Sequence, residues 1–149
     1  MFKPRVYFLV FLYKKENLMP STLIEVRQNY SPEIEVGIID AVHSALCEVF
    51  KIKPTDKNIR LLVHEPHRFA CPTNYEQPET YIHISIDCFA GRTIQTKRLL
   101  YKSIVKKLSH YGIPAKNIKI LLREITTENW GIRGGQAACD VELGFDINI

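Results

Sequence analysis

The sequence has few of the features that identify specialised protein classes. Its four cysteines, Cys47, Cys71, Cys88 and Cys139, form no closely spaced pairs. A domain of this size does not need disulfides, so we interpret them as reduced and predict a cytoplasmic protein. The apolar and charged fractions, 46% and 24%, exclude disordered and collagen-like classes. A net charge of +4 with both signs mixed along the chain does not indicate a polyanionic partner.

The sequence also lacks a run long enough to cross a bilayer. The apolar residues 6–13 are flanked by basic residues, but the run is too short to span a membrane and has no small-residue cleavage site. An extra strand, a surface anchor and a leader from an upstream start codon are three interpretations of residues 1–18. We favour the leader because this segment has no counterpart in the internal repeat. We therefore predict an N-terminal extension, 1–18, before a domain at 19–149.

Common cofactor and nucleophile motifs are missing as well. His64, His67 and Cys71 have metal-ligand spacing, but a structural zinc site needs four ligands and there is no second cluster. Gly131 to Gly135 lacks the Lys-Ser/Thr of a phosphate-binding loop, and no Ser/His/Asp or Cys/His motif stands out. The lysines of the second predicted helix are not interleaved with aromatic residues, which argues against nucleic acid. We predict no metal, no cofactor and no nucleic-acid or membrane partner.

Two segments of the chain repeat each other. Residues 57–65 and 116–124 match position by position in residue type, and each follows a proline-containing helix end, at Pro54 and Pro114. Each half is therefore predicted to form a strand, a helix and a second strand. Two copies predict a pseudo-twofold core and not a solenoid, which needs at least three.

Each half contains one predicted helix. Ser31 supplies a capping hydroxyl before Pro32, and the helix runs to about Phe50; Thr93 caps a second helix that reaches Tyr111. The inward-facing residues of the first are Ile34, Ile38, Val42, Leu46 and Val49, and those of the second are Ile94, Leu100, Tyr101, Ile104, Val105 and Leu108. The basic residues of the second helix form a solvated face: Lys97, Arg98, Lys102, Lys106 and Lys107.

The expected fold is α/β (α+β), with two β-α-β units. Right-handed crossovers lay both helices on one face of a four-stranded mixed sheet. In this predicted fold, one helix layer cannot cover all of the apolar strand residues Leu61, Val63, Ile82 and Ile84. The second face therefore needs cover, which another subunit supplies.

Pro20 opens the first strand, at residues 21–27. If translation starts at Met19 and the methionine is removed, the ring nitrogen of Pro20 is a free secondary amine that can act as a base. Desolvation in an apolar core lowers the pKa of such an amine toward neutral pH. The alternative is that Pro20 merely starts a strand, where no hydrogen-bond donor is needed.

A second candidate site lies at residues 89–93, where a strand ends and a helix begins. The first-turn amides and the guanidinium of Arg92 converge on a carboxylate or phosphate site; the alternative is an arginine in a surface turn. Further on, the glycine-rich loop 129–136 holds the only tryptophan, Trp130. Such loops usually reach beyond their own unit.

Together these features resemble the tautomerase superfamily. They are Met-Pro at a strand start, two strand-helix-strand units, Gly-Arg-Thr-x-x-x-Lys from Gly91 and Glu-Asn-Trp-Gly-Ile-Arg-Gly-Gly from Glu128. The chain from Pro20 to about Ala138 is similar to the fused members, such as malonate semialdehyde decarboxylase and its tautomerase-like relatives. The resemblance implies a homotrimer with an amino-terminal proline as acid or base at the subunit interface.

The resemblance also implies roles for particular residues. It places Pro20 as the catalytic proline, Arg92 as the carboxylate-binding arginine and Asp56 as the aspartate beside the proline. Trp130 and Ile132 take the place of the family's apolar wall. The implied substrate is a small carboxylate, and no cofactor is required.

Two departures from the decarboxylase pattern shape the expected activity. Ala90 stands where that pattern has a second arginine, and residues 1–18, if retained, acylate the nitrogen of Pro20. We therefore expect keto-enol tautomerisation of a 2-oxo or 2-hydroxy-enoic acid. The alternatives are a non-catalytic trimeric module or pseudoenzyme, and a decarboxylase or hydratase that acts on a 3-oxo acid.

Overall fold

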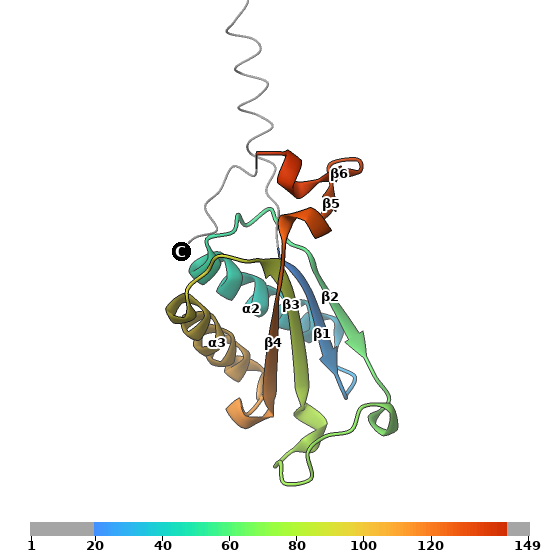
Figure 1. Ribbon diagram of the computed structural model, residues 1–149. Coiled ribbons are helices and arrows are strands. Elements are labelled where there is room, and N and C mark those ends of the chain that lie inside the picture. Colours follow the sequence, from blue (N-terminus) through green and yellow to red (C-terminus); the bar gives the residue numbers. More distant parts are fainter. Residues whose placement is uncertain (1–19, 143–149) are drawn as a thin grey trace, which may run out of the picture.

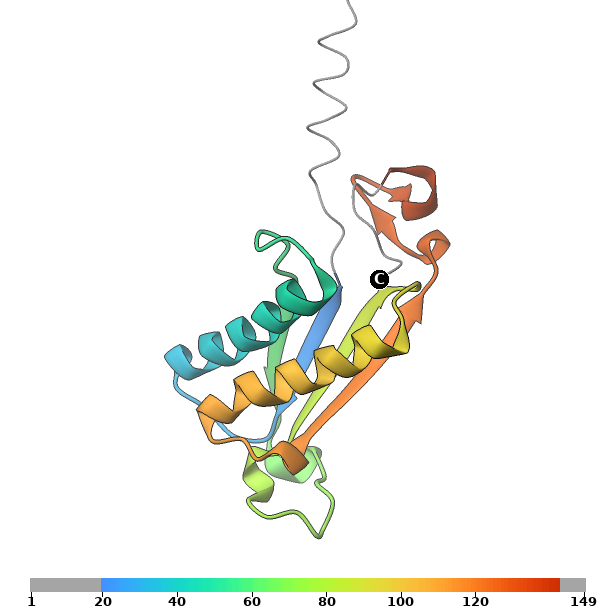
Figure 2. The same ribbon diagram turned by 90° about the vertical axis from the view of Figure 1, so that its left-hand side faces the viewer.

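The computed structural model describes residues 20–142, so the predictions for residues 1–18 and for the segment beyond 142 lie outside it. The described chain forms a four-stranded sheet with two α-helices on one face and a small hairpin beyond one end (Figures 1 and 2). In chain order the elements are β1 (Ser21–Val26), α2 (Pro32–Phe50), β2 (Ile59–Val63), β3 (Ile82–Phe89), α3 (Ile94–Leu108), β4 (Ile118–Ile125), β5 (Gly131–Ile132) and β6 (Gln136–Ala137).

The sheet has the order β2-β1-β3-β4. β1 pairs with β2 in parallel and β3 with β4 in parallel, whereas the central strands β1 and β3 are antiparallel. Each parallel pair is joined through one helix, and both helices lie on the same face (Figure 2). The predicted fold of two β-α-β units is therefore confirmed.

Both helices begin where the capping residues indicated. Ser31 Oγ accepts a hydrogen bond from the Ile34 amide at 3.4 Å, and Thr93 Oγ1 accepts one from the Thr96 amide at 3.2 Å. α3 ends at Leu108 and continues to Tyr111 as a 3-10 helix. Within residues 20–142, no helix has the length and apolar content needed to cross a membrane.

The core lies between the helices and the sheet. Ile24, Ile86, Leu46 and Ile104 are among its fully buried members. Two predicted core residues are wrong: Ile34 is 38% exposed and Ile94 is 55% exposed. Each lies in the first turn of its helix, before the part that packs on the sheet, where burial begins at Ile38 and Leu100.

The assignment of residues to the two faces of the sheet also needs correction. Ile82 and Ile84 are fully buried, and Leu61 and Val63 pack against the same core. All four therefore face the one helix layer, because cross-strand neighbours in register share a face.

The open face of the sheet is mixed in polarity. Leu62 and Leu121 are each 46% exposed, and Arg123 makes a bidentate pair with Asp87 at 2.6 and 3.2 Å. The face that another subunit could cover is therefore part apolar and part charged.

Candidate functional site

The topology gathers the predicted site residues at one end of the sheet, which we call the site end. β1 and β2 begin at this end, and β3 and β4 finish there, because the central strands are antiparallel. Pro20 precedes β1, Asp56 precedes β2, Arg92 follows β3, and Trp130 and Ile132 follow β4 (Figure 1). Five residues from four separate stretches thus lie around one edge of the molecule.

Pro20 is buried at the entry to the centre of the sheet. Ser21 pairs with Asp87, so the antiparallel register puts Pro20 level with Cys88 on the neighbouring strand. Burial raises the pKa of the Cys88 thiol to about 11. Cys88 is therefore a neutral thiol and not a nucleophile at physiological pH.

Arg92 is the most unusual side chain of the site end. We expected it at a helix entry outside the core, but it is only 6% exposed, with its guanidinium carbon 4.1 Å from the centroid of the Phe50 ring. Its Nη1 donates a long hydrogen bond, 3.4 Å, to the carbonyl of Phe89. Its Nε is buried and has no hydrogen-bond partner among residues 20–142.

The environment of Arg92 favours an incoming anion. Burial lowers the pKa of its guanidinium, although the nearby Cys88 and Glu124 raise it. A buried donor without an acceptor is rare in proteins, and a guanidinium pairs best with a planar carboxylate. The arginine therefore has the chemistry to bind the carboxylate of a small ligand.

Asp56 lies in the loop between α2 and β2 and is half-buried. Its amide donates to the carbonyl of Lys53 at 2.9 Å. Burial, and secondarily the Asp56 carboxylate, raise the pKa of Cys47 on α2. Asp56 is therefore close to α2, and its role beside Pro20 stays a prediction.

Trp130 and Ile132 belong to a small apolar cluster with Phe89 and Ala138, which we call the apolar wall. The rings of Trp130 and Phe89 meet edge to face, 5.2 Å between centroids, and Trp130 Nε1 donates to the carbonyl of Ile125 at 3.3 Å. Because Phe89 also accepts the hydrogen bond from Arg92, the wall lies directly beside the guanidinium.

Sequence reasoning missed several residues of the site end. Phe89 and Ala138 complete the wall, Phe50 lies under Arg92, and Glu124 accepts a hydrogen bond from the Gly91 amide at 3.3 Å. The one available signal concerned Glu124, which closes the second copy of the repeat.

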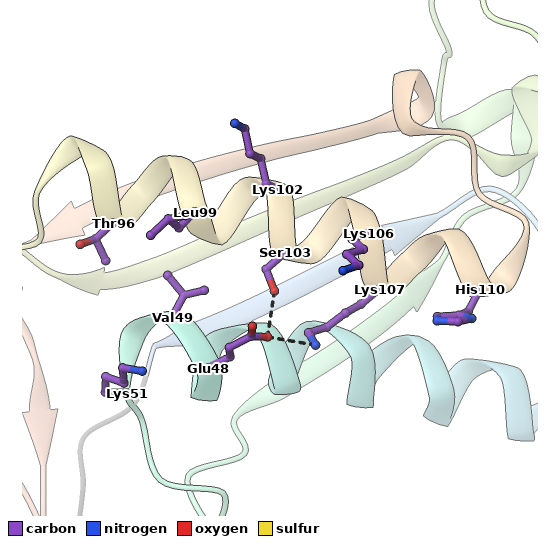
Figure 3. Close-up of a pocket in the computed structure, with 10 residues that line it drawn as sticks. All are labelled: Glu48, Val49, Lys51, Thr96, Leu99, Lys102, Ser103, Lys106, Lys107 and His110. Atoms are coloured by element: carbon purple, nitrogen blue, oxygen red, sulfur yellow. Dashed lines mark hydrogen bonds and ion pairs between the residues drawn. The ribbon is translucent and has the colours of Figure 1, made fainter.

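A separate cavity lies between α2 and α3 (Figure 3). It measures about 770 Å³ and is lined by Glu48, Val49, Lys51, Thr96, Leu99, Lys102, Ser103, Lys106, Lys107 and His110. Glu48 accepts hydrogen bonds from Ser103 at 3.3 Å and from Lys107 at 3.0 Å, which links the two helices. None of the predicted site residues lines this cavity, so we interpret it as a groove in the outer surface of the helix layer.

The structure brings no metal ligands together in the part of the chain it describes: residues 20–142 contain no cluster of three or more His, Cys, Asp or Glu side chains. His64, the first residue of the H-x2-H-x3-C segment, instead has its Nε2 3.0 Å from Glu25 Oε1, and its ring contacts Phe69.

Known structures share this fold. FG41 malonate semialdehyde decarboxylase inhibited by 3-bromopropiolate is 28% identical, with a TM-score of 0.71 over 80% of this chain and 94% of that chain. A malonate semialdehyde decarboxylase studied for its decarboxylase and hydratase activities is 17% identical, with a TM-score of 0.72 over 81% and 98% of the two chains. The F6 fused 4-OT, an asymmetric trimer, is 20% identical, with a TM-score of 0.67 over 80% and 97%.

The family model described as "Tautomerase enzyme" matches residues 56–133. This range holds Asp56, Arg92, Trp130 and Ile132 and begins after Pro20. Because the match covers more than half of the chain, and because the fold agrees with it, this protein belongs to the tautomerase family.

Proposed function

We propose that this protein is a cofactor-independent tautomerase that moves a proton between carbon and oxygen of a 2-oxo or 2-hydroxy-enoic acid. The observation that carries the proposal is the buried Arg92, whose Nε has no acceptor in the described part of the chain, at the sheet end where Pro20 enters. Arg92 binds the substrate carboxylate, and the free amine of Pro20 takes the proton from the enol and returns it at carbon. The apolar wall excludes water, so the amine stays neutral.

A decarboxylase or hydratase acting on a 3-oxo acid is the second candidate. The 28% identity to FG41 malonate semialdehyde decarboxylase favours it. Against it stands Ala90, an exposed residue at the position of that pattern's second arginine. A single guanidinium suits substrate binding by one carboxylate, so we rank tautomerisation first.

The active form in this proposal is a homotrimer. The F6 fused 4-OT is a trimer, and the open sheet face of this chain presents Leu62 and Leu121 to a neighbour. One chain contributes Arg92 and the apolar wall to the pocket. A second subunit beside the site end would complete it. A non-catalytic trimeric module keeps the same assembly without a free Pro20.

The decisive experiment compares protein that begins at Pro20 with protein that begins at Met1. Only the first should tautomerise the enol of phenylpyruvate, because an amide nitrogen is not basic in water. Activity is followed by ultraviolet absorbance, and intact mass establishes the first residue of each sample. Both samples should sediment as trimers at micromolar concentration.

Chemical labelling provides an independent readout. 3-Bromopropiolate, which inhibits the FG41 relative, should add covalently to Pro20 in the shorter protein and leave the longer one unmodified at this residue, as shown by peptide mapping. Equal activity of the two proteins would exclude Pro20 as the base. Inactivity of both on every enol tried would favour the non-catalytic module.

A further inference from the structure

Glu124 fixes the turn that precedes Arg92. Its Oε2 accepts the Gly91 amide at 3.3 Å, and its Oε1 pairs with Lys97 on the first turns of α3. Gly91 has a φ of +130°, a conformation that side-chain-bearing residues rarely adopt. One carboxylate thus ties together the end of β4, the turn and the start of α3.

Glu124 is also a potential competitor for Arg92. Its Oε2 lies 3.3 Å from the amide nitrogen of Gly91, the residue directly before Arg92, and the two charged groups shift the pKa of one another. If Glu124 paired with Arg92, it would occupy the donors that a substrate carboxylate needs. In the structure Lys97, whose side chain is only 18% exposed, holds the carboxylate instead.

We propose that Lys97 is a positioning residue that keeps Glu124 on the Gly91 amide and away from Arg92, and so leaves the guanidinium free to bind a substrate carboxylate. This inference rests on the proposed function of Arg92. The chain provides a matched control, because Glu48 and Lys107 form a second carboxylate-lysine pair on α2 and α3, in the groove and away from Arg92.

The kinetic test uses the trimeric protein that begins at Pro20, with phenylpyruvate as substrate. Lys97→Met should raise KM about fivefold with kcat nearly unchanged. Without Lys97, the carboxylate of Glu124 can pair with Arg92 and compete with the substrate carboxylate, at a strength typical of a modest ion pair. The double variant Lys97→Met/Glu124→Gln should return KM to within about twofold of wild type, because glutamine carries no charge to compete. Lys107→Met should leave KM unchanged.

A second readout does not depend on catalysis. In ¹H–¹⁵N spectra of substrate-free protein, the Nε–H signal of Arg92, assigned by its loss in Arg92→Lys, should move in Lys97→Met and return in the double variant. Lys107→Met should not move it.

The proposal is overturned if Lys97→Met and Lys107→Met behave alike in the spectra, or if the double variant is further from wild type than Lys97→Met. A protein without tautomerase activity that still shows the expected Arg92 shifts would refute the proposed function and leave the Lys97 inference standing.

Discussion

Asn117 and Arg92 are buried polar side chains at opposite ends of the sheet, and they differ in how fully they are hydrogen-bonded. At the end away from the site, Asn117 is 1% exposed and its side-chain amide donates to the carbonyls of Glu76 and Gln77, at 2.7 and 2.9 Å, and to Thr80 Oγ1 at 2.7 Å. At the site end, Arg92 is 6% exposed, donates a long hydrogen bond to a backbone carbonyl, and has an Nε without a partner within the described residues.

The internal repeat sharpens this contrast. Asn58 and Asn117 are the same position of the two copies and stand just before β2 and β4, at opposite ends of the sheet. Asn117 pins the loop before β3, whereas Asn58 is exposed and offers its backbone carbonyl to the Thr22 amide. Asn117 closes one end of the duplicated fold through its own hydrogen bonds, and the other end holds the buried cation that we propose binds a ligand.

The largest expected effect comes from removing the cation. Arg92→Ala should raise KM for phenylpyruvate about 10- to 150-fold, the equivalent of roughly 1.5–3 kcal/mol for a charge-assisted pair. The melting temperature should not fall in proportion, since the guanidinium has few protein partners to lose. Steady-state kinetics and calorimetry on the protein that begins at Pro20 measure both.

Arg98→Ala is the control for this change, because Arg98 is an exposed arginine on α3, the helix that follows Arg92. An unchanged KM in Arg92→Ala would move the anion site to Arg123 or Arg133. A large loss of stability would mean that Arg92 is structural, like Asn117.

Asn117→Ala should lower stability and leave KM unchanged, which is the opposite of the effect expected for Arg92→Ala. The Asn117 substitution removes three hydrogen bonds and leaves the carbonyl of Glu76 without its Asn117 donor, while the carbonyl of Gln77 keeps the Thr80 amide and hydroxyl. We therefore expect about 1–3 kcal/mol less stability and an unchanged KM. Asn58→Ala, at the equivalent repeat position, should change stability by less than about 0.5 kcal/mol. Urea denaturation measures both variants, and equal losses would remove the contrast between the two ends.

The smallest expected effect is on the loss of stability at acid pH. Hydrogen bonding to Lys97, opposed by desolvation, lowers the pKa of Glu124 below its ordinary value of 4.5. A carboxylate with a lowered pKa stabilises the fold above about pH 4.5, and this contribution is lost as the pH falls through the folded-state pKa. Glu124→Gln should therefore reduce the difference in melting temperature between pH 7 and pH 3 by about 1–2 °C. Asn117→Ala should not, because an amide does not titrate.

Local patterns in the sequence predicted the elements of the fold well. Ser31, Pro32 and Thr93 act within one helical turn, so their positions fixed both helix starts. The repeat predicted the pairing of strands because it carries the same strand twice. Ile34 and Ile94 failed because periodicity gives the side of a helix but not how far along its length the packing begins.

The candidate site was predictable only in outline. The burial of Arg92 depends on Phe50, which lies far away in sequence and reaches it only after α2 and α3 pack together. The pairing of Glu124 on β4 with Lys97 on α3 likewise depends on where these two elements lie relative to each other. The roles of Asp56, Trp130 and Ile132 stay predictions from the family resemblance, and the experiments on the two start sites test that of Pro20.

The place of β1 in the sheet has a consequence for how Pro20 moves. Chain ends usually fray on fast timescales, but β1 is hydrogen-bonded to β2 on one side and β3 on the other. Amides of Leu23 and Ile24 should therefore exchange with deuterium among the slowest in the protein, through openings that approach global unfolding. The proposed base, Pro20, is therefore held as rigidly as the core, and we expect the substrate to adapt to it.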